Sequence, residues 1–373
     1  DQTGYQIDFT YDVLDRLVFM ESNQGQKKTI TYDAMGNVLT MTNSKGITTN
    51  YEYTKSGKLK AVLDPLGTKT CYTYDEMDRL LMVKQVTTFE EEWEEVQKIN
   101  QQKERLLVQY KRNLEGYLIS SQNGEGDTTY YQRDYRGKAL TITDAEGKDT
   151  HYTYDYAGNI KKVLYPDGKK MQMEYDALHQ LIQLEDWMGV TRIERNLDGM
   201  PVCITDYRGN TMQYEWDCYG NKTKMRYPDG KEIFYKYGKN QKLARIQWEK
   251  EFIEYEYDEK GYLEKKNYSN GKTSTYGYNK NGKLQFILHK QEREMLKYQY
   301  EYDIEGLPIA IREDNSNGSA RYRYEYDALN RIIKVEKDLC FLRGYEYDGF
   351  GNRIKKKERN GETYYQYNEA NQL

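Results

Sequence analysis

The chain has 373 residues, a mass of 44.5 kDa, a formal net charge of −4 and a hydrophobic fraction of only 37%. Charged residues make up 31% of it with both signs interspersed, so it lacks the clustered basic face that a nucleic-acid groove requires. No run of about 18 apolar residues occurs, which excludes a transmembrane helix. We therefore expect no nucleic-acid partner and no membrane insertion by this segment.

The pattern Tyr-x-Tyr-Asp-x-x-Gly-Asn recurs about every 21 residues from one end of the chain to the other. We call the second residue of each Tyr-x-Tyr pair the anchor. In chain order the 17 anchors are Tyr11, Tyr32, Tyr53, Tyr74, Arg112, Arg133, Tyr154, Tyr175, Arg195, Trp216, Tyr237, Tyr257, Tyr278, Tyr302, Tyr326, Tyr347 and Tyr367. Such a period indicates one supersecondary unit copied many times, because a single copy cannot bury its apolar face alone. We predict a single repeat array over residues 1–373.

Each copy predicts two short strands and two tight turns. The residue two before the anchor is aromatic or aliphatic in all 17 copies, and residues i and i+2 share one face of a strand. Asp or Asn follows the anchor in 15 copies, and Gly stands four residues after it in 11. Gly, Asn and Asp tolerate positive φ, so this position is predicted to be the left-handed residue of a hairpin turn. A second Gly, six to eight residues before most anchors, predicts the turn that links successive hairpins.

The complete copies of the pattern supply the residues that we predict to be structural in the repeat. They are Tyr32, Asp33, Gly36, Tyr154, Asp155, Gly158, Tyr257, Asp258, Gly261, Tyr347, Asp348 and Gly351. The Asp residues are interpreted as acceptors for turn amides. A calcium-binding ladder of these carboxylates is the weaker alternative, since they are not clustered as calcium ligands are. The anchors Arg112, Arg133 and Arg195 depart from the aromatic pattern, and the sequence offers no explanation for them.

Seventeen hairpins give about 34 strands, whereas open twisted sheets rarely exceed about 10 strands without curling or splitting. The 40 tyrosines suit a single layer that is exposed to solvent on both faces better than the solvent-free core of a sandwich, because each hydroxyl needs water or a hydrogen-bond partner. We predict an all-β fold, in which a repetitive antiparallel β-hairpin ribbon curls into a spiral, hollow, shell-like sheet.

One step, from Tyr74 to Arg112, is longer than the others and contains an insertion at residues 88–106. The insertion has no Gly or Pro, begins with a capping-box pattern, and places Phe89, Trp93 and Val96 on one helical face. We predict a helix there, with a long hairpin extension as the alternative. The three apolar residues are candidates for a partner contact, and an insertion that packs back on the sheet is the alternative.

The residue types that commonly act in catalysis or bind metals are scattered along the chain. The histidines His151, His179 and His289 lie far apart and in different phases of the repeat, and His179 occupies the left-handed turn position. No catalytic triad, metalloprotease motif or phosphate-binding loop occurs. We therefore predict no catalytic residue, no metal site and no cofactor. The cysteines Cys71, Cys203, Cys218 and Cys340 are predicted to be buried or half-buried free thiols, although Cys203 and Cys218 lie in consecutive hairpins.

The sequence resembles the YD-repeat, or Rhs-repeat, proteins, through signatures such as those at residues 154–160 and 347–354. That family includes bacterial Rhs polymorphic toxins, the shell-forming subunits of insecticidal Tc toxins, wall-associated proteins and teneurins. The resemblance implies a non-catalytic shell that encapsulates a C-terminal toxin or other passenger domain of the same polypeptide. It also implies a secreted or cell-surface location within a larger bacterial protein. Because both ends of the chain fall within a repeat, we expect a fragment that is open at both ends.

Residues 64–67 have the sequence Asp-Pro-Leu-Gly. Rhs toxins cleave themselves near an Asp-Pro-x-Gly motif, but here residues 64–67 align with the ordinary linking turns at 43–46 and 144–147. We therefore interpret them as a turn.

The alternative function is a cell-surface adhesion scaffold that binds a carbohydrate or a protein, because aromatic rings stack on sugars. Cross-strand Tyr pairs that stabilise the sheet explain the same residues.

Overall fold

The computed structural model describes residues 6–91, 99–368 and 370–372, which form one antiparallel sheet of 33 strands without any helix. In chain order the strands are β1 (Ile7–Tyr11), β2 (Leu17–Ser22), β3 (Lys27–Tyr32), β4 (Val38–Asn43), β5 (Thr48–Tyr53), β6 (Leu59–Leu63), β7 (Lys69–Tyr74), β8 (Leu80–Glu91), β9 (Ile99–Arg112), β10 (Leu118–Gln122), β11 (Thr128–Arg133), β12 (Ala139–Thr143), β13 (Asp149–Tyr154), β14 (Ile160–Leu164), β15 (Lys170–Tyr175), β16 (Leu181–Asp186), β17 (Gly189–Arg195), β18 (Pro201–Thr205), β19 (Thr211–Trp216), β20 (Lys222–Arg226), β21 (Glu232–Tyr237), β22 (Leu243–Trp248), β23 (Glu251–Tyr257), β24 (Leu263–Tyr268), β25 (Thr273–Tyr278), β26 (Leu284–Gln291), β27 (Glu294–Tyr302), β28 (Pro308–Asn315), β29 (Gly318–Tyr326), β30 (Ile332–Lys337), β31 (Cys340–Tyr347), β32 (Arg353–Glu358) and β33 (Gly361–Tyr364). Each strand pairs with the next in sequence, from β1 with β2 to β32 with β33.

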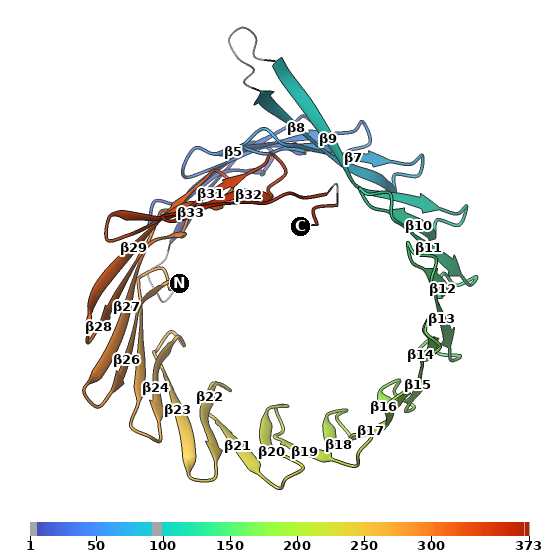
Figure 1. Cartoon of the computed structure of the whole chain (residues 1–373), viewed down its shortest axis with the longest axis vertical. Helices are drawn as coiled ribbons and strands as arrows, with labels where there is room; N and C mark the ends of the chain where they lie inside the picture. Colours follow the sequence, from blue (N-terminus) through green and yellow to red (C-terminus); the bar gives the residue numbers. More distant parts are fainter. Residues whose placement is uncertain (1–5, 92–98, 369, 373) are drawn as a thin grey trace.

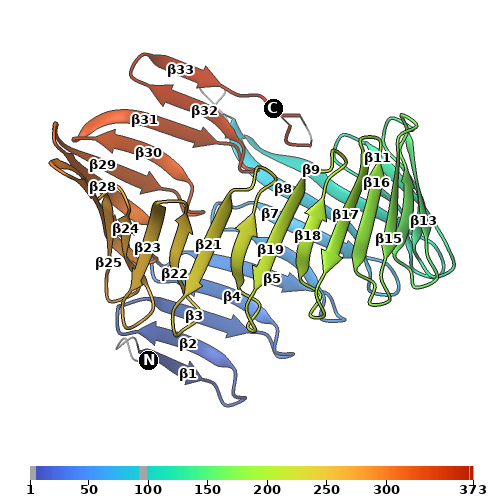
Figure 2. The same ribbon diagram turned by 90° about the horizontal axis from the view of Figure 1, so that it is seen from below.

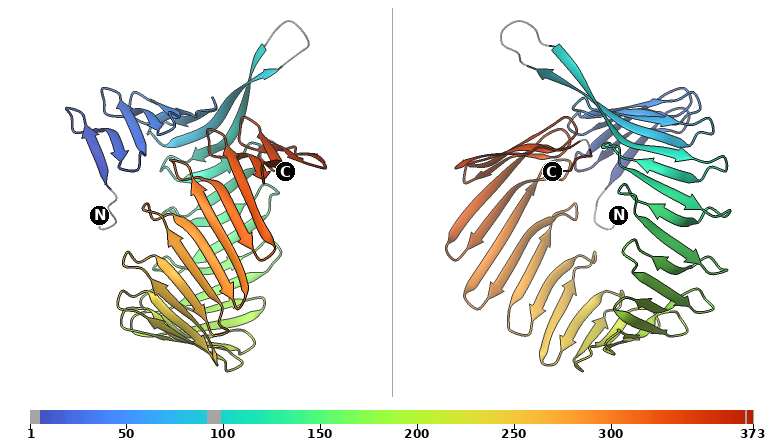
Figure 3. Two further views of the ribbon diagram at one scale, coloured as in Figure 1. Left: turned by 90° about the vertical axis from the view of Figure 1, so that its left-hand side faces the viewer. Right: turned by 45° about the vertical axis from the view of Figure 1, so that its right-hand side comes forward.

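The ribbon of hairpins curls into a ring-shaped spiral in which the two ends of the chain overlap (Figure 1). Seen from the side, β1 and β33 lie at opposite ends of the spiral axis (Figure 2). The oblique views show the same single layer of strands (Figure 3). No described strand crosses the middle of the ring, so the predicted curled, shell-like sheet is confirmed.

The turn that follows each anchor, which we call the anchor turn, has the predicted geometry. In the turn at residues 33–36, Gly36 has a φ of 88°. The Asp33 carboxylate accepts hydrogen bonds from the amides of Met35 (2.9 Å) and Asn37 (2.8 Å). The side-chain amide of Asn37 also donates to it, and these bonds hold the pKa of Asp33 below its usual value. The copies without Gly keep a positive φ at the same position, in Asp15, Asp78, His179, Gln241, Asn330 and Asn371.

The hairpins closed by anchor turns differ in register from those closed by the linking turns at the other edge of the sheet. Thr31 pairs with Thr40 but Tyr32 pairs with Val38, which leaves Leu39 as an extra residue. All 16 described hairpins with an anchor turn have such a shift. Among the hairpins with a linking turn, only β8–β9 and β30–β31 have one. Because a bulge bends its strand and raises the twist, bulges repeated along one edge account for the curl of the sheet.

The predicted helix at residues 88–106 is wrong wherever the structure describes that segment. Strands β8 and β9 pair from Met82 with Gln109 to Glu91 with Ile99, and they stand out from the ring (Figure 1). Both strands continue pairing that the repeat has already begun, and this pairing overrides a modest local helix preference. The alternative of a long hairpin extension is thus confirmed. The side chain of Phe89, together with Trp93 and Val96, lies outside the described residues, so their partner contact stays a prediction.

A pair of glycine substitutions tests the turn geometry. Gly137 (φ 82°) and Gly147 (φ 77°) have similar left-handed backbones, but only at Gly137 would a Cβ lie within 3 Å of a ring, that of Tyr117. Gly147→Ala should cost about 1–2 kcal/mol of unfolding free energy from backbone strain alone. We expect Gly137→Ala to cost more, because Tyr117 must move as well. Urea unfolding of both variants measures the difference, and equal costs would contradict the close approach of the ring.

Candidate functional site

Most hairpins are held to the preceding one by the anchor. The hydroxyl of Tyr154 donates to the carbonyl oxygen of Ala139 at 2.8 Å, and Ala139 is the residue that pairs with Arg133 at the preceding bulge. A bulge interrupts the regular backbone pairing, so the anchor supplies a donor at the interruption. Burial raises the pKa of Tyr154, which keeps its hydroxyl protonated and able to donate.

The same bond recurs along the array at 2.7–3.2 Å. It is made by Tyr32, Tyr74, Tyr154, Tyr175, Tyr237, Tyr257, Tyr278, Tyr302, Tyr326, Tyr347 and Tyr367. Four of the residues that the sequence predicts to be structural in the repeat, Tyr32, Tyr154, Tyr257 and Tyr347, make this bond. The sequence did not predict that each bonds to the hairpin before it.

Trp216 and two of the arginine anchors, Arg133 and Arg195, perform the same task with a different donor. The third arginine anchor, Arg112, instead donates to the carbonyl of Gly116 in its own turn at 3.4 Å. The Arg133 Nε donates to the carbonyl of Leu118 at 2.7 Å, and its Nη1 donates to the carbonyl of Gly137 in its own turn at 2.8 Å. Arg195 makes the matching pair of contacts, to Leu181 and Gly199. A guanidinium carries several donors, so it can serve the bulge carbonyl and the turn together.

The residue after the left-handed turn position strengthens the link between hairpins. The guanidinium carbon of Arg331 lies 4.4 Å from the ring centre of Tyr347, the anchor of the next hairpin. Lys138 lies over the Tyr154 ring at 4.9 Å and also donates to the carbonyl of Gly158. Exposed cation–π contacts contribute about 0.5–1 kcal/mol each. Gly158 suits its φ of 92°, and a Cβ there would also displace the end of the Lys138 side chain.

The overlapping ends of the spiral meet along a seam. We use this name for the contact of the linking turns at residues 22–25, 43–46, 64–67 and 123–126 with the anchor turns at residues 303–306, 327–330 and 348–351 and with residues 368, 370 and 371. The Lys45 ammonium lies 2.6 Å from the Asp303 carboxylate, and the amide of Ser44 donates to Glu305 at 2.7 Å. Ser44 and Glu305 are 261 residues apart in the sequence. The seam thus joins one coil of the spiral to the next.

Further contacts extend the seam along the coil. The hydroxyl of Thr68 donates to the carbonyl of Gly349. The guanidinium of Arg105, which lies on the long hairpin, stacks 4.2 Å from the ring centre of Phe350. The amide of Ala370 donates to the Glu125 carboxylate at 3.0 Å. Residues 64–67 are therefore an ordinary linking turn beside Thr68, as predicted, and this turn lies at the seam.

The Lys45–Asp303 pair is the charged contact of the seam. Partial burial alone would raise the pKa of Asp303, but hydrogen bonds from Lys45 and from the amides of Leu307 and Gly306 outweigh it. The pKa of Asp303 is therefore held below its usual value. The side chains are only 14% exposed for Asp303 and 29% for Lys45, so solvent screens this pair less than a fully exposed one.

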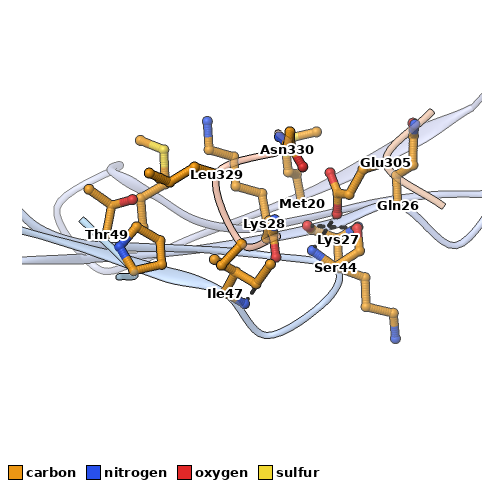
Figure 4. Close-up of a pocket in the computed structure, with 14 residues that line it drawn as sticks. Met20, Gln26, Lys27, Lys28, Ser44, Ile47, Thr49, Glu305, Leu329 and Asn330 are labelled. Atoms are coloured by element: carbon orange, nitrogen blue, oxygen red, sulfur yellow. Dashed lines mark hydrogen bonds between the residues drawn. The ribbon is translucent and has the colours of Figure 1, made fainter. Parts of the chain in front are cut away.

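A pocket of about 520 Å³ lies within the seam (Figure 4). Its walls combine Met20, Lys28 and Thr49 of the first hairpins with Leu329 and Asn330 of a late anchor turn. In the close-up, Glu305 reaches Ser44 beside this pocket. The walls combine apolar side chains with polar and charged ones, which include Lys27, Lys28 and Glu305.

The predicted turn and thiol roles of the remaining candidates hold in the structure. His179 lies in an anchor turn with a φ of 63°. The four cysteines are free, but only Cys71 and Cys203 are half-buried as predicted, whereas Cys218 and Cys340 are exposed. His289 Nδ1 lies 2.8 Å from the hydroxyl of Ser274, and burial lowers the pKa of His289.

Within residues 6–91, 99–368 and 370–372, no group of three or more His, Cys, Asp or Glu is arranged to hold a metal ion. The same residues contain no helix that is long and apolar enough to cross a bilayer.

Comparison with known proteins identifies the repeat. Residues 1–125 and 192–313 match the Teneurin YD-shell family model, and residues 133–170 match the RHS Repeat model. The fold is similar to a crystal structure of TcdB2–TccC3–TEV, with a TM-score of 0.63 at 15% identity over 97% of this chain. It is also similar to TcdB2–TccC3 without a hypervariable C-terminal region, with a TM-score of 0.57 at 14% identity over 96% of this chain. The chain spans only 24% and 22% of those two longer chains. No curated protein matches the sequence.

The anchor bond can be tested within one hairpin. Tyr154→Phe removes the donor to Ala139 and should lower the free energy of unfolding by about 1 kcal/mol. Tyr156, which is fully exposed, is a matched control, so Tyr156→Phe should leave stability unchanged. The urea midpoints of the two variants measure the difference. If they agree, the anchor hydroxyl does not stabilise the array.

The seam can be tested through the charge of Asp303. Its depressed pKa means that its stabilising effect is complete above the usual Asp pKa and is lost as the pH falls through the folded-state pKa. Asp303→Asn should speed amide hydrogen exchange in residues 43–46 at neutral pH. The wild type should lose this protection below about pH 4, after correction for intrinsic rates.

Asp155→Asn is the control for this experiment. Asp155 accepts hydrogen bonds from the backbone amide (2.8 Å) and the side chain (2.9 Å) of Asn159 in its own anchor turn, which lies outside the seam, so its loss leaves the Lys45–Asp303 contact intact. Exchange in residues 43–46 should then match the wild type. Equal exchange in both variants would show that the seam is not held by Asp303.

Proposed function

The chain belongs to the teneurin YD-shell family, and from this premise we propose that its curled sheet is the wall of a shell that encloses a passenger segment of the same polypeptide. The observation that carries the proposal is the seam, because it turns an open ribbon into a wall closed around an axis. A wall of this kind acts sterically: it keeps proteases and partners away from what it surrounds. None of its residues acts as a catalyst in this proposal.

A C-terminal toxin is the passenger that we favour. One structure with the same fold is TcdB2–TccC3 without a hypervariable C-terminal region. A variable region at the end of such a protein is the kind of segment that a common wall could enclose. A secreted or cell-surface location would suit this role, since delivery of a passenger takes place outside the producing cell.

A reporter joined after Leu373 tests enclosure. A small protease-sensitive domain placed there should resist trypsin when the seam is closed. Lys45→Glu places two carboxylates together at the seam, so we expect the reporter to be cut at least several-fold faster in this variant. Lys148→Glu, which reverses a lysine paired with Glu146 on the open surface, should leave protection unchanged. A wild-type chain whose reporter is cut as fast as the free reporter would contradict the proposal.

The alternative function is a cell-surface scaffold that recognises a carbohydrate or a protein. Exposed aromatic side chains at the linking turns favour it, since Trp187 is 54% exposed and lies beside Tyr165 and Lys169. A glycan array probed with the chain separates the two functions. Binding that is lost in Trp187→Ala would support recognition, whereas protection of the reporter without any glycan binding would support enclosure.

A further inference from the structure

The seam pocket is formed by side chains from two coils of the spiral. Met20, Met41 and Ile47 belong to the first hairpins, whereas Leu329 and Asn330 belong to an anchor turn of the last coil. Its volume of about 520 Å³ lies within the usual range of small-molecule sites, roughly 300–1,000 Å³. Because the pocket exists only where the two coils meet, a molecule that binds in it contacts both of them.

One cation in the pocket wall has no counterion. Lys28 is half-buried on β3, and within the described part of the chain no carboxylate lies within ion-pair distance of its ammonium. Lys27 also lines the pocket, but it pairs with Glu21 at 3.0 Å. The Glu305 carboxylate accepts a hydrogen bond from the amide of Ser44 at 2.7 Å. Lys28 is therefore left as an unpaired positive charge beside the pocket.

The repeat does not require a lysine at this position. Lys28 stands four residues before the anchor Tyr32, and the corresponding residues of the next two hairpins are Thr49 and Thr70. A half-buried charge without a partner gives up hydration and gains no ion pair in return, so Lys28 does not help to stabilise the sheet. An anion in the pocket supplies the partner that the chain itself does not.

The other walls suit the apolar part of a ligand. Met20 and Met41 have flexible thioether side chains that adapt to the shape of what they contact. In the close-up, the turn that carries Leu329 and Asn330 lies across the strands that carry Lys28 and Thr49 (Figure 4). The pocket thus combines an unpaired ammonium with apolar surface from both coils, which is the chemistry that an organic anion requires.

We propose that the seam pocket binds a small organic carboxylate with an apolar body. The carboxylate pairs with Lys28, and the apolar body packs on Met20 and Leu329. A ligand that contacts both coils binds only the closed seam, so its binding stabilises the seam by mass action. The ligand concentration thus sets how firmly the spiral is closed. This inference concerns the seam alone and does not depend on whether the shell encloses a passenger.

Isothermal titration calorimetry with octanoate, below its micelle concentration, tests the proposal. The wild-type chain should bind octanoate in a saturable manner, and the uncharged octanamide about tenfold more weakly or less, as expected for the loss of a charged hydrogen bond. Lys28→Thr introduces the residue of the next hairpins, so the sheet should stay intact while the affinity for octanoate falls by a similar factor. Lys60→Thr removes an exposed lysine outside the pocket and should leave the affinity unchanged.

Three results of these titrations would overturn the proposal. They are a wild-type chain that does not bind octanoate, equal affinities for octanoate and octanamide, and a Lys28→Thr variant that binds octanoate as tightly as the wild type does. Circular dichroism of each variant verifies that the sheet is intact.

A second pair of variants tests whether both coils form the site. Leu329→Asp places a carboxylate in the pocket from the last coil, and its repulsion should weaken octanoate binding about tenfold or more. Leu178→Asp is the matched control, because residues 176–178 and 327–329 share the sequence Asp-Ala-Leu in their anchor turns and Leu178 is 69% exposed outside the seam. A Leu329→Asp variant that binds as the wild type does would place the ligand elsewhere and contradict the proposal.

Hydrogen exchange tests the effect of the ligand on the seam. Octanoate should slow amide exchange in residues 43–46 of the wild type, because it favours the closed seam, and should have no such effect in Lys28→Thr. Exchange in these residues that octanoate leaves unchanged in the wild type would show that the ligand does not hold the coils together.

Discussion

The structure depends on one recurring contact, the hydrogen bond that most anchors donate to the bulge carbonyl of the preceding hairpin. A bulge opens a gap in backbone pairing, and the Tyr154 hydroxyl fills the gap at Ala139 with a bond of 2.8 Å. The bulge and the anchor therefore need each other: without the bulge the sheet would not curl, and without the anchor the bulge would leave a polar group without a partner. Each such bond contributes only about 1 kcal/mol, but it recurs in nearly every hairpin, so stability is a sum over neighbours.

Curvature at one edge of the sheet gives the array its coiled, wall-like shape. The bulges lie beside the anchor turns and not beside most linking turns, so the strands bend and twist more at one edge of the sheet than at the other. The ribbon therefore coils until its edges meet, and there Lys45 and Asp303 fasten one coil to the next. A wall that is one layer thick needs little aliphatic core, which agrees with a chain whose hydrophobic fraction is 37%. Tyrosine suits this wall because its ring covers the sheet while its hydroxyl bonds to backbone.

The local structure could be predicted from the sequence, but the contacts between distant segments could not. Gly36 and Asp33 were predictable because turn geometry restricts the residues that fit. The insertion was misjudged because its local pattern fits a helix, while the strands on either side had already fixed a hairpin. The role of Arg133 was hidden, since its target, Leu118, is defined by the register of the preceding hairpin. The seam was also beyond prediction, because Ser44 and Glu305 meet only through the summed curvature of more than twenty strands.

The central claim is that the ribbon closes on itself, and small-angle X-ray scattering of the monomer tests it most directly. Thirty-three strands spaced at about 4.8 Å would extend roughly 160 Å if the sheet were flat, which corresponds to a radius of gyration of about 45 Å. Coiling into the ring described here predicts about 25–30 Å, with a pair-distance distribution typical of a hollow body. A radius near the larger value, with the profile of an elongated ribbon, would contradict the account.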